Sequence, residues 1–387
     1  MTAETPLLEI ASLIEEAGGQ DLHACMQCGT CTGVCPWPLV EAFSPRRIFR
    51  EMSLGLEGWE AELVWRCVTC RACVQRCPRS LDITGIMQSA RTVLQQSGAA
   101  PRGLTVPLAS LRTQGNPWEG DRTDRRDWPE AVGAPLFTSD CESLLFPCCT
   151  QVYDPRHRRA ARALNSLLSL AGYRFGTLKE ELSCCGDQAR KVGAPDVFDD
   201  LSLGNLQAFR AHGVKRVFTS SPHCLDVLRA GPGVEAEHTT QVLWRLVQEG
   251  RLEPTRPVPA VVTYHDPCYL GRYAGVYDAP RRLISAIPGV EFREMPRSRE
   301  ESLCCGGGGG GMFLEMLPEQ RFSVHRVREA MATGASLLVT ACPTCVLMFE
   351  DAIKATGLEG ELEVLDVAEL LSRSIPAGPI APGGEAP

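Results

Sequence analysis

The sequence Cys304-Cys305-Gly306-Gly307-Gly308-Gly309-Gly310-Gly311 decides how the second half of this chain folds. Cys268 precedes it within His265-Asp266-Pro267-Cys268, and Cys342 and Cys345 follow it as a C-x-x-C pair. Five thiolates brought together by folding would surround a large iron–sulfur assembly. Glycines would let the backbone pass close to its sulfides and offer N–H groups to sulfur. We therefore expect Gly306, Gly307 and Gly308 to contact the cofactor.

Two other interpretations of the glycine run explain less. A flexible linker accounts neither for the paired cysteines at its start nor for the apolar Met312-Phe313-Leu314 at its end. The run also matches G-x-G-x-x-G, but no strand with the right pattern enters it, which excludes a dinucleotide site.

Two more cysteine runs lie near the N-terminus, and both read C-x-x-C-x-x-C-x-x-x-C-P. This is the run of bacterial two-cluster ferredoxins, in which three cysteines hold one cubane and the fourth reaches the other. We expect cluster I, a [4Fe-4S] cubane, on Cys25, Cys28, Cys31 and Cys77. We expect cluster II, a second such cubane, on Cys67, Cys70, Cys73 and Cys35. Structural zinc is the competing interpretation, although zinc sites usually need only paired C-x-x-C.

The composition favours metal or redox chemistry. The chain has 387 residues, enough for two or three domains, and 19 cysteines. No export signal and no long apolar run are visible, so we expect a cytoplasmic protein with no membrane span, touching a membrane only through a partner. The net charge of −8 argues against nucleic acid as a partner. Arginine carries nearly all the positive charge, which we interpret as compositional bias.

Residues 1–98 are expected to form an α-helical ferredoxin domain. Helical patterns lie at 5–17, 59–64 and 83–94, and Ser44-Pro45 predicts the start of a helix through Arg50. The Pro/Gly-rich stretch that follows predicts a connector at 99–140 that wraps the surface, with Trp118 and Trp128 as packing anchors. The Pro/Gly/Ala-rich tail, 373–387, is expected to be disordered.

From residue 141 the pattern alternates between short apolar strands and longer helices, which predicts an α/β fold with mostly parallel pairing. Strands are expected at 144–146, 214–219, 261–264 and 336–340, and helices at 155–171, 196–211, 279–286, 318–332 and 344–355.

This α/β half is an internal duplication. Cys149 and Cys268 are 119 residues apart, Cys185 and Cys305 are 120 apart, and Cys224 and Cys345 are 121 apart. Such a constant offset indicates two copies of one unit, a first repeat at 141–255 and a second at 256–372. Their cysteine loops would meet at a shared cleft.

The first repeat departs from the second at one informative position, where Ser221 replaces Cys342. A hydroxyl is a much poorer iron ligand than a thiolate. Three possibilities stay open for this copy: an altered cluster using Cys148 as replacement, a zinc site, or a degenerate empty site. The thiols concerned are Cys149, Cys184, Cys185 and Cys224. Our hypothesis is that only the second repeat holds the five-thiolate cluster.

Two ferredoxin runs followed by two cysteine-rich CCG repeats resemble heterodisulfide reductase D-type proteins, in which the C and B subunits are fused. The arrangement is similar to the iron–sulfur subunits of glycolate, lactate and anaerobic glycerol-3-phosphate oxidising systems. It also resembles subunits of class II benzoyl-coenzyme A reductase complexes and of membrane oxidoreductases linked to electron-transfer flavoprotein. The resemblance implies Rossmann-like CCG repeats and a noncubane [4Fe-4S] cluster on Cys268, Cys304, Cys305, Cys342 and Cys345. Ser221 departs from the pattern for a second noncubane cluster.

Three functions are compatible with these motifs. The first is an electron-transfer subunit that exchanges electrons with a flavoprotein or another iron–sulfur subunit, because the chain has no flavin, nicotinamide or molybdopterin fingerprint of its own. The second is a disulfide reductase acting at the noncubane cluster, with His223 or His265 supplying protons. The third, a zinc-binding scaffold, fits the doubled eight-cysteine run poorly.

Overall fold

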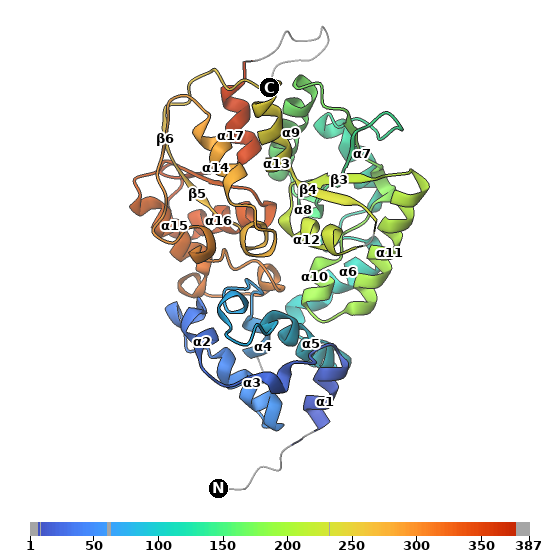
Figure 1. Cartoon of the computed structure of the whole chain (residues 1–387), viewed down its shortest axis with the longest axis vertical. Coiled ribbons are helices and arrows are strands. Elements are labelled where there is room, and N and C mark those ends of the chain that lie inside the picture. The colour runs from blue at the N-terminus through green and yellow to red at the C-terminus, as the bar shows by residue number, and fades with distance from the viewer. Residues whose placement is uncertain (1–6, 8, 60–62, 232, 377–387) are drawn as a thin grey trace.

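The computed structural model describes residues 7, 9–59, 63–231 and 233–376, and it shows a helical domain below two α/β units that lie side by side (Figure 1). The helical domain lies at one end of the molecule, with the first repeat on one side of the upper body and the second repeat on the other. The predicted fold class is confirmed.

The helical domain consists of short helices joined by the cysteine loops. Helix α3 begins as expected, because Ser44 Oγ accepts a hydrogen bond from the amide of Arg47 (3.2 Å) and Pro45 takes the first helical position. Of the helix expected at 59–64, residues 60–62 lie outside the described ranges, and α4 begins at Leu63. The helices are α1 (Glu9–Glu16), α2 (Thr30–Val34), α3 (Pro45–Leu54), α4 (Leu63–Arg66) and α5 (Ile83–Gln96).

The connector contains two helices, α6 (Thr105–Gln114) and α7 (Arg122–Val132), which the sequence analysis missed. The glycines and the aspartate that suggested a linker are the residues that begin and end these helices. Asp121 caps α7 by accepting from the amide of Thr123 (2.7 Å), and Gly115 and Gly133 end the two helices in the left-handed conformation. Trp128 is an anchor as expected, since its indole N–H donates to the carbonyl of Gln151 (3.0 Å) in the core.

Each repeat is built on a four-stranded parallel sheet with the same topology. The strand orders are β2-β1-β3-β4 in the first repeat and β6-β5-β7-β8 in the second. The expected parallel pairing is confirmed. The first repeat contains β1 (Ser143–Leu145), α8 (Cys149–Tyr153), α9 (His157–Leu170), β2 (Phe175–Gly176), α10 (Asp187–Lys191), α11 (Pro195–Ala211), β3 (Arg216–Thr219), α12 (Pro222–Ala230), β4 (Glu235–His238) and α13 (Thr239–Gln248). The second contains β5 (Ala260–His265), α14 (Asp278–Ser285), β6 (Val290–Phe292), α15 (Phe322–Ala332), β7 (Leu337–Thr340), α16 (Pro343–Thr356), β8 (Glu363–Asp366) and α17 (Val367–Ser374).

The two repeats pack on each other through equivalent helices. Helix α9 of the first repeat contacts α17 of the second, and α13 of the first contacts α14 of the second. One hydrophobic core runs through both sheets and these helices. In each repeat, cysteines follow the carboxyl ends of the two central strands, which is where parallel sheets place their sites. The vicinal pair, Cys184-Cys185 or Cys304-Cys305, comes in the segment after the edge strand β2 or β6.

The C-terminal part of the chain ends in α17, whose last residue is Ser374, so the helix runs past the predicted boundary at residue 373. The rest of the expected tail, from residue 377, lies outside the described ranges. Within those ranges, none of the helices has the length and apolar character needed to cross a bilayer.

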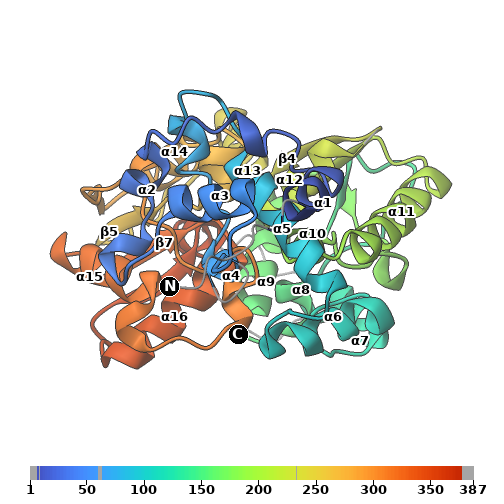
Figure 2. The same cartoon turned by 90° about the horizontal axis from the view of Figure 1, so that it is seen from below.

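The helical domain is joined to both repeats by buried Arg91 of α5. Its guanidinium donates to the carbonyls of Cys67 in its own domain (2.5 Å), of Lys191 in the first repeat (2.8 Å) and of Gly309 in the second (2.9 Å). Figure 2, seen from the side of the helical domain, shows α4 and α5 across the middle of the molecule between α16 and α10. Arg91 therefore holds the three units in one arrangement.

The glycine run packs directly on the cysteine loop of the helical domain. A Cβ on Gly308 would lie 2.5 Å from the carbonyl oxygen of Val68, and one on Gly309 would come within 3.0 Å of that of Cys67. Gly309 also has a φ of 60°, which L side chains rarely adopt. Only glycine permits this approach of two backbones.

We expect the substitution Gly309→Ala to destabilise the protein by about 2–4 kcal/mol, because the left-handed backbone and the collision with the carbonyl of Cys67 each add about 1–2 kcal/mol. The measurement is a urea titration of anaerobically purified protein, followed by far-ultraviolet circular dichroism. Gly213→Ala is the matched control, with a φ of 64° and no atom within 4 Å of its Cβ. It should lose only about 1 kcal/mol, and equal losses in the two variants would contradict the contact.

Candidate metal centres

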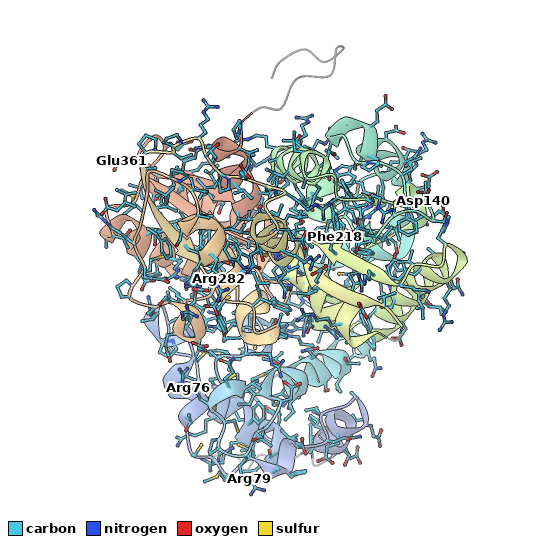
Figure 3. All side chains as sticks on the ribbon, turned by 45° about the horizontal axis from the view of Figure 1, so that its top comes forward. Arg76, Arg79, Asp140, Phe218, Arg282 and Glu361 are labelled. Atoms are coloured by element: carbon cyan, nitrogen blue, oxygen red, sulfur yellow. The ribbon has the colours of Figure 1, made fainter. Side chains whose placement is uncertain are left out.

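The four cysteines predicted for cluster I line one cavity. Cys25, Cys28, Cys31 and Cys77 surround it together with Arg46 and Arg79. Cys28 is exposed and the other three are half-buried. Figure 3 shows Arg79 at the end of the helical domain that is remote from the repeats. The structure thus gathers these four thiols at an outer surface of the molecule.

The cysteines predicted for cluster II lie deeper and closer to the repeats. Burial raises the pKa of Cys73 well above its usual range, and the neighbouring thiols of Cys67, Cys70 and Cys35 raise it further. Cys35 comes from the first cysteine run and the other three from the second. The two runs therefore exchange their fourth cysteine in space, while the assignment of metal to each set stays a prediction.

The second repeat brings its five predicted thiols into one buried chain of contacts. The Sγ atoms of Cys268 and Cys304 are 4.0 Å apart, and those of Cys305 and Cys345 are 3.4 Å apart. Cys304 also contacts Cys305, and Cys345 contacts Cys342. Every one of the five is buried.

These thiols cannot all ionise without a counter-cation. Contact with Cys268, together with Cys305, Cys70 and burial, raises the pKa of Cys304 well above its usual range. Against its burial, contacts with Cys345 and His223 lower the pKa of Cys342 to about 6. A crowded thiol set of this kind is what a multivalent soft metal centre relieves, because metal binding deprotonates every ligating thiol. The donor set therefore fits an iron–sulfur cluster.

Backbone amides of the glycine run face the sulfurs at its start. The amide of Gly306 donates to Cys304 Sγ (3.3 Å), and the amide of Gly307 donates to Cys305. Gly308 lies instead against the carbonyl of Val68, as described above. The contact between domains requires a glycine at position 308, while contact of Gly306, Gly307 and Gly308 with a cofactor stays a prediction.

His265 contacts the same site from β5. A ring nitrogen lies within 4.8 Å of the sulfurs of Cys305 and Cys345. Burial, reinforced by the cations of Arg326 and Arg272, lowers the pKa of His265 well below its usual range. Nε of Arg326 donates to Nδ1 of the ring (3.2 Å), so the proton of the neutral ring is on Nε2. The buried Nε2–H has no hydrogen-bond partner among the described residues, so the ring offers a free donor and has no imidazolium proton to release.

His223 reaches the second repeat from the first. Its Nδ1 lies 2.8 Å from Oδ2 of Asp187, its ring stacks on Tyr269, and it contacts the thiol of Cys342. Burial opposes the charge, but Asp187 raises the pKa of His223 well above its usual range. The pair places an imidazolium beside a thiol of the other repeat, and both members of the pair are buried.

The helical domain and the second repeat meet at their thiols. Contact with the thiol of Cys304, aided by the cation of Arg272, lowers the pKa of Cys70 to about 6 in spite of burial. Arg272 is itself buried, and its Nε donates to the carbonyl of Cys70 (2.6 Å). Cys70 belongs to the cluster II set and Cys304 to the five-thiol set, so the two sets are in direct contact.

The first repeat gathers its own buried thiols. The predicted Cys149, Cys184, Cys185 and Cys224 lie in one cluster of side chains, and Cys148 lies there too. The amide of Gly186 donates to Cys184 Sγ (3.4 Å), as that of Gly306 does to Cys304 in the second repeat. Buried Arg125 donates to Cys149 Sγ (3.3 Å).

The arginines are the functional residues that the sequence analysis missed. Four buried arginines lie at these sites. Three of them donate to a residue of a cysteine loop, namely Arg91, Arg125 and Arg272. The fourth, Arg326, donates to His265. No local motif marks them, but the excess of arginine over lysine was a signal. Arginine keeps its charge when buried, whereas lysine loses its proton readily.

Comparison with known proteins agrees with this architecture. A 4Fe-4S dicluster domain is matched at residues 21–81, and a cysteine-rich domain is matched twice, at residues 143–229 and 262–350. One component of the dihydromethanophenazine:CoB–CoM heterodisulfide reductase of Methanosarcina barkeri is 31% identical over 97% of this chain and 99% of that protein.

Two longer relatives share the same region. The EtfAB:quinone oxidoreductase of Syntrophomonas wolfei is 33% identical over 84% of this chain, and a Bacillus subtilis protein named "Probable iron-sulfur-binding oxidoreductase FadF" is 31% identical over 92%. This chain covers 48% of the first and 60% of the second. With its dicluster domain followed by two cysteine-rich domains, the chain belongs to the family of iron–sulfur oxidoreductase proteins that includes this heterodisulfide reductase component.

Proposed function

We propose that this chain is the electron-transfer subunit of a cytoplasmic oxidoreductase complex, with cubanes I and II in the helical domain and a noncubane [4Fe-4S] cluster in the second repeat. The ligands are those predicted above. Bound in these sites, the clusters would supply one-electron transfer. The chain's own residues hold them in series and set the charge around them.

The contact between Cys70 and Cys304 carries this proposal. It joins a ligand of cluster II to a ligand of the five-thiol set, with no side chain between them. Arg272 compensates the charge at this junction, since its pKa is raised by Cys70, Cys268 and Cys304 despite burial. At the opposite end, exposed Cys28 gives the cluster I set access to a partner surface.

The partner proposed for that surface is a flavoprotein or a further iron–sulfur subunit. One relative is named as an oxidoreductase of an electron-transfer flavoprotein and quinone, which supports the flavoprotein. A flavin converts two-electron hydride chemistry into the single electrons that iron–sulfur clusters accept. Any membrane contact would belong to a partner.

Reduction of a disulfide in the second repeat is the second candidate, and a cavity favours it. A space of about 350 Å³ opens beside Cys304 and is also lined by Cys35, Cys70 and Arg272. Figure 3 shows Arg76, another lining residue, at the side of the helical domain that faces the second repeat. The volume is sufficient for a small sulfur compound.

We expect two-electron-reduced electron-transfer flavoprotein to reduce the anaerobically purified chain, seen as loss of cluster absorbance. With reduced viologen as donor and a panel of disulfides as acceptors, the chain should turn over no faster than its Cys304→Ser variant. Disulfide turnover that disappears in that variant would instead establish the second candidate.

We expect His265 to raise the reduction potential of the second-repeat cluster, because a ring nitrogen lies within 4.8 Å of the sulfurs of Cys305 and Cys345. Its Nε2–H, which has no partner among the described residues, is free to donate to their thiolates. Loss of one hydrogen bond to a charged group costs about 1–3 kcal/mol, so His265→Leu should lower the midpoint potential by tens of millivolts. A redox titration followed by electron paramagnetic resonance measures it. His265→Gln, which keeps an N–H donor, should lie closer to the wild type, and equal potentials in all three proteins would refute the role.

A further inference from the structure

The thiols of the first repeat form a chain of contacts that parallels the one in the second. In the second repeat the order is Cys268, Cys304, Cys305, Cys345 and Cys342. In the first repeat Cys149 contacts Cys184, Cys184 contacts Cys185, and Cys185 contacts Cys224. The fifth place is filled, because the thiol of Cys148 contacts both Cys224 and the hydroxyl of Ser221.

Cys148 fills that place from a different strand. Ser221 follows β3 as Cys342 follows β7, and its Oγ caps α12 by accepting from the amide of Cys224 (3.5 Å). Cys148 follows β1, and the residue aligned with it in the second repeat is Pro267, which has no thiol. The fifth cysteine therefore comes from a different loop in each repeat. In the second repeat it lies in the loop after β7, and in the first repeat it lies in the loop after β1.

The surroundings of this set suit an anionic centre. All five thiols are at most 7% exposed. Buried Arg125 donates one hydrogen bond to Cys149 Sγ and one to the carbonyl of Pro147 (3.4 Å). A buried cation is costly unless negative charge lies beside it, and ligated thiolates would provide that charge. Zinc would use four of the five thiols and leave the fifth without a role.

We propose that the first repeat binds a four-iron cluster of the same kind as the second, with Cys148 supplying the thiolate that Ser221 lacks. The ligands are Cys148, Cys149, Cys184, Cys185 and Cys224. This inference rests on the proposed function, in which the second repeat binds such a cluster. It reverses the expectation drawn from Ser221 alone, since the lost thiol is replaced in space by one that is distant in sequence.

The test is the iron, zinc and acid-labile sulfide content of the full chain purified anaerobically. The wild type should contain about sixteen irons and Cys148→Ser about twelve, with loss of one cluster signal in Mössbauer or electron paramagnetic resonance spectra. The double variant Cys148→Ser/Ser221→Cys places the thiol at the position of the first repeat that corresponds to Cys342. This variant should recover the iron. Cys141→Ser is the control, because Cys141 lies outside every set.

Two results would overturn the inference and leave the proposed function intact. In the first, the wild type and Cys148→Ser both contain about twelve irons, and Cys342→Ser contains about eight. The other is one equivalent of zinc that disappears with Cys148. About eight irons in the wild type, insensitive to Cys342→Ser, would instead refute the proposed function. A Cys148→Ser protein that fails to fold while the double variant folds with twelve irons would also overturn the inference, because the restored thiol would then bind no cluster.

Discussion

The approach of the glycine run to the cysteine loop of the helical domain fixes the rest of the arrangement. Gly308 and Gly309 lie so close to the carbonyls of Val68 and Cys67 that no side chain fits between the two backbones. Arg91 bonds to both segments and to the first repeat, so three units share one buried guanidinium. This contact sets the position of Cys304 relative to Cys70. These two glycines thus allow the helical domain and the second repeat to approach each other, in addition to any contact of the glycine run with a cofactor.

Charge is the second constraint. The structure buries the five thiols of each repeat and Cys70 and Cys73 of the cluster II set, and it buries arginines with them. Arg272 lies where two sets meet, Arg125 lies in the first repeat, and Arg326 fixes the tautomer of His265. Buried thiolates and buried guanidiniums are each costly alone and tolerable together. The Asp187–His223 pair extends the same principle across the two repeats, with an imidazolium held beside Cys342.

Much of this could be predicted from the sequence because cysteine spacing is local. The two ferredoxin runs, the duplication and the parallel α/β pattern follow from offsets and periodicity. The outer strands of both sheets, β2, β4, β6 and β8, were missed. Strand β2 has two residues and β6 has three, while β4 reads Glu-Ala-Glu-His and β8 reads Glu-Val-Leu-Asp, with few apolar residues. The connector helices were missed because their caps look like linker residues. Arg91 acts through contacts with residues distant in sequence, which no spacing rule reveals. Ser221 illustrates the limit: the sequence shows the lost thiol and offers Cys148 as one of three possibilities, and only the folded chain shows Cys148 in contact with Ser221 and Cys224.

Magnetic interaction between cluster II and the second-repeat cluster is the most direct test of the series of sites. Both are reduced or oxidised to paramagnetic states in the anaerobically purified chain, and spin relaxation is measured by electron paramagnetic resonance. Because Cys70 contacts Cys304, we predict broadened signals and faster relaxation whenever both centres are paramagnetic together. Two signals that keep the same width and relaxation rate whatever the state of the other centre would contradict the junction.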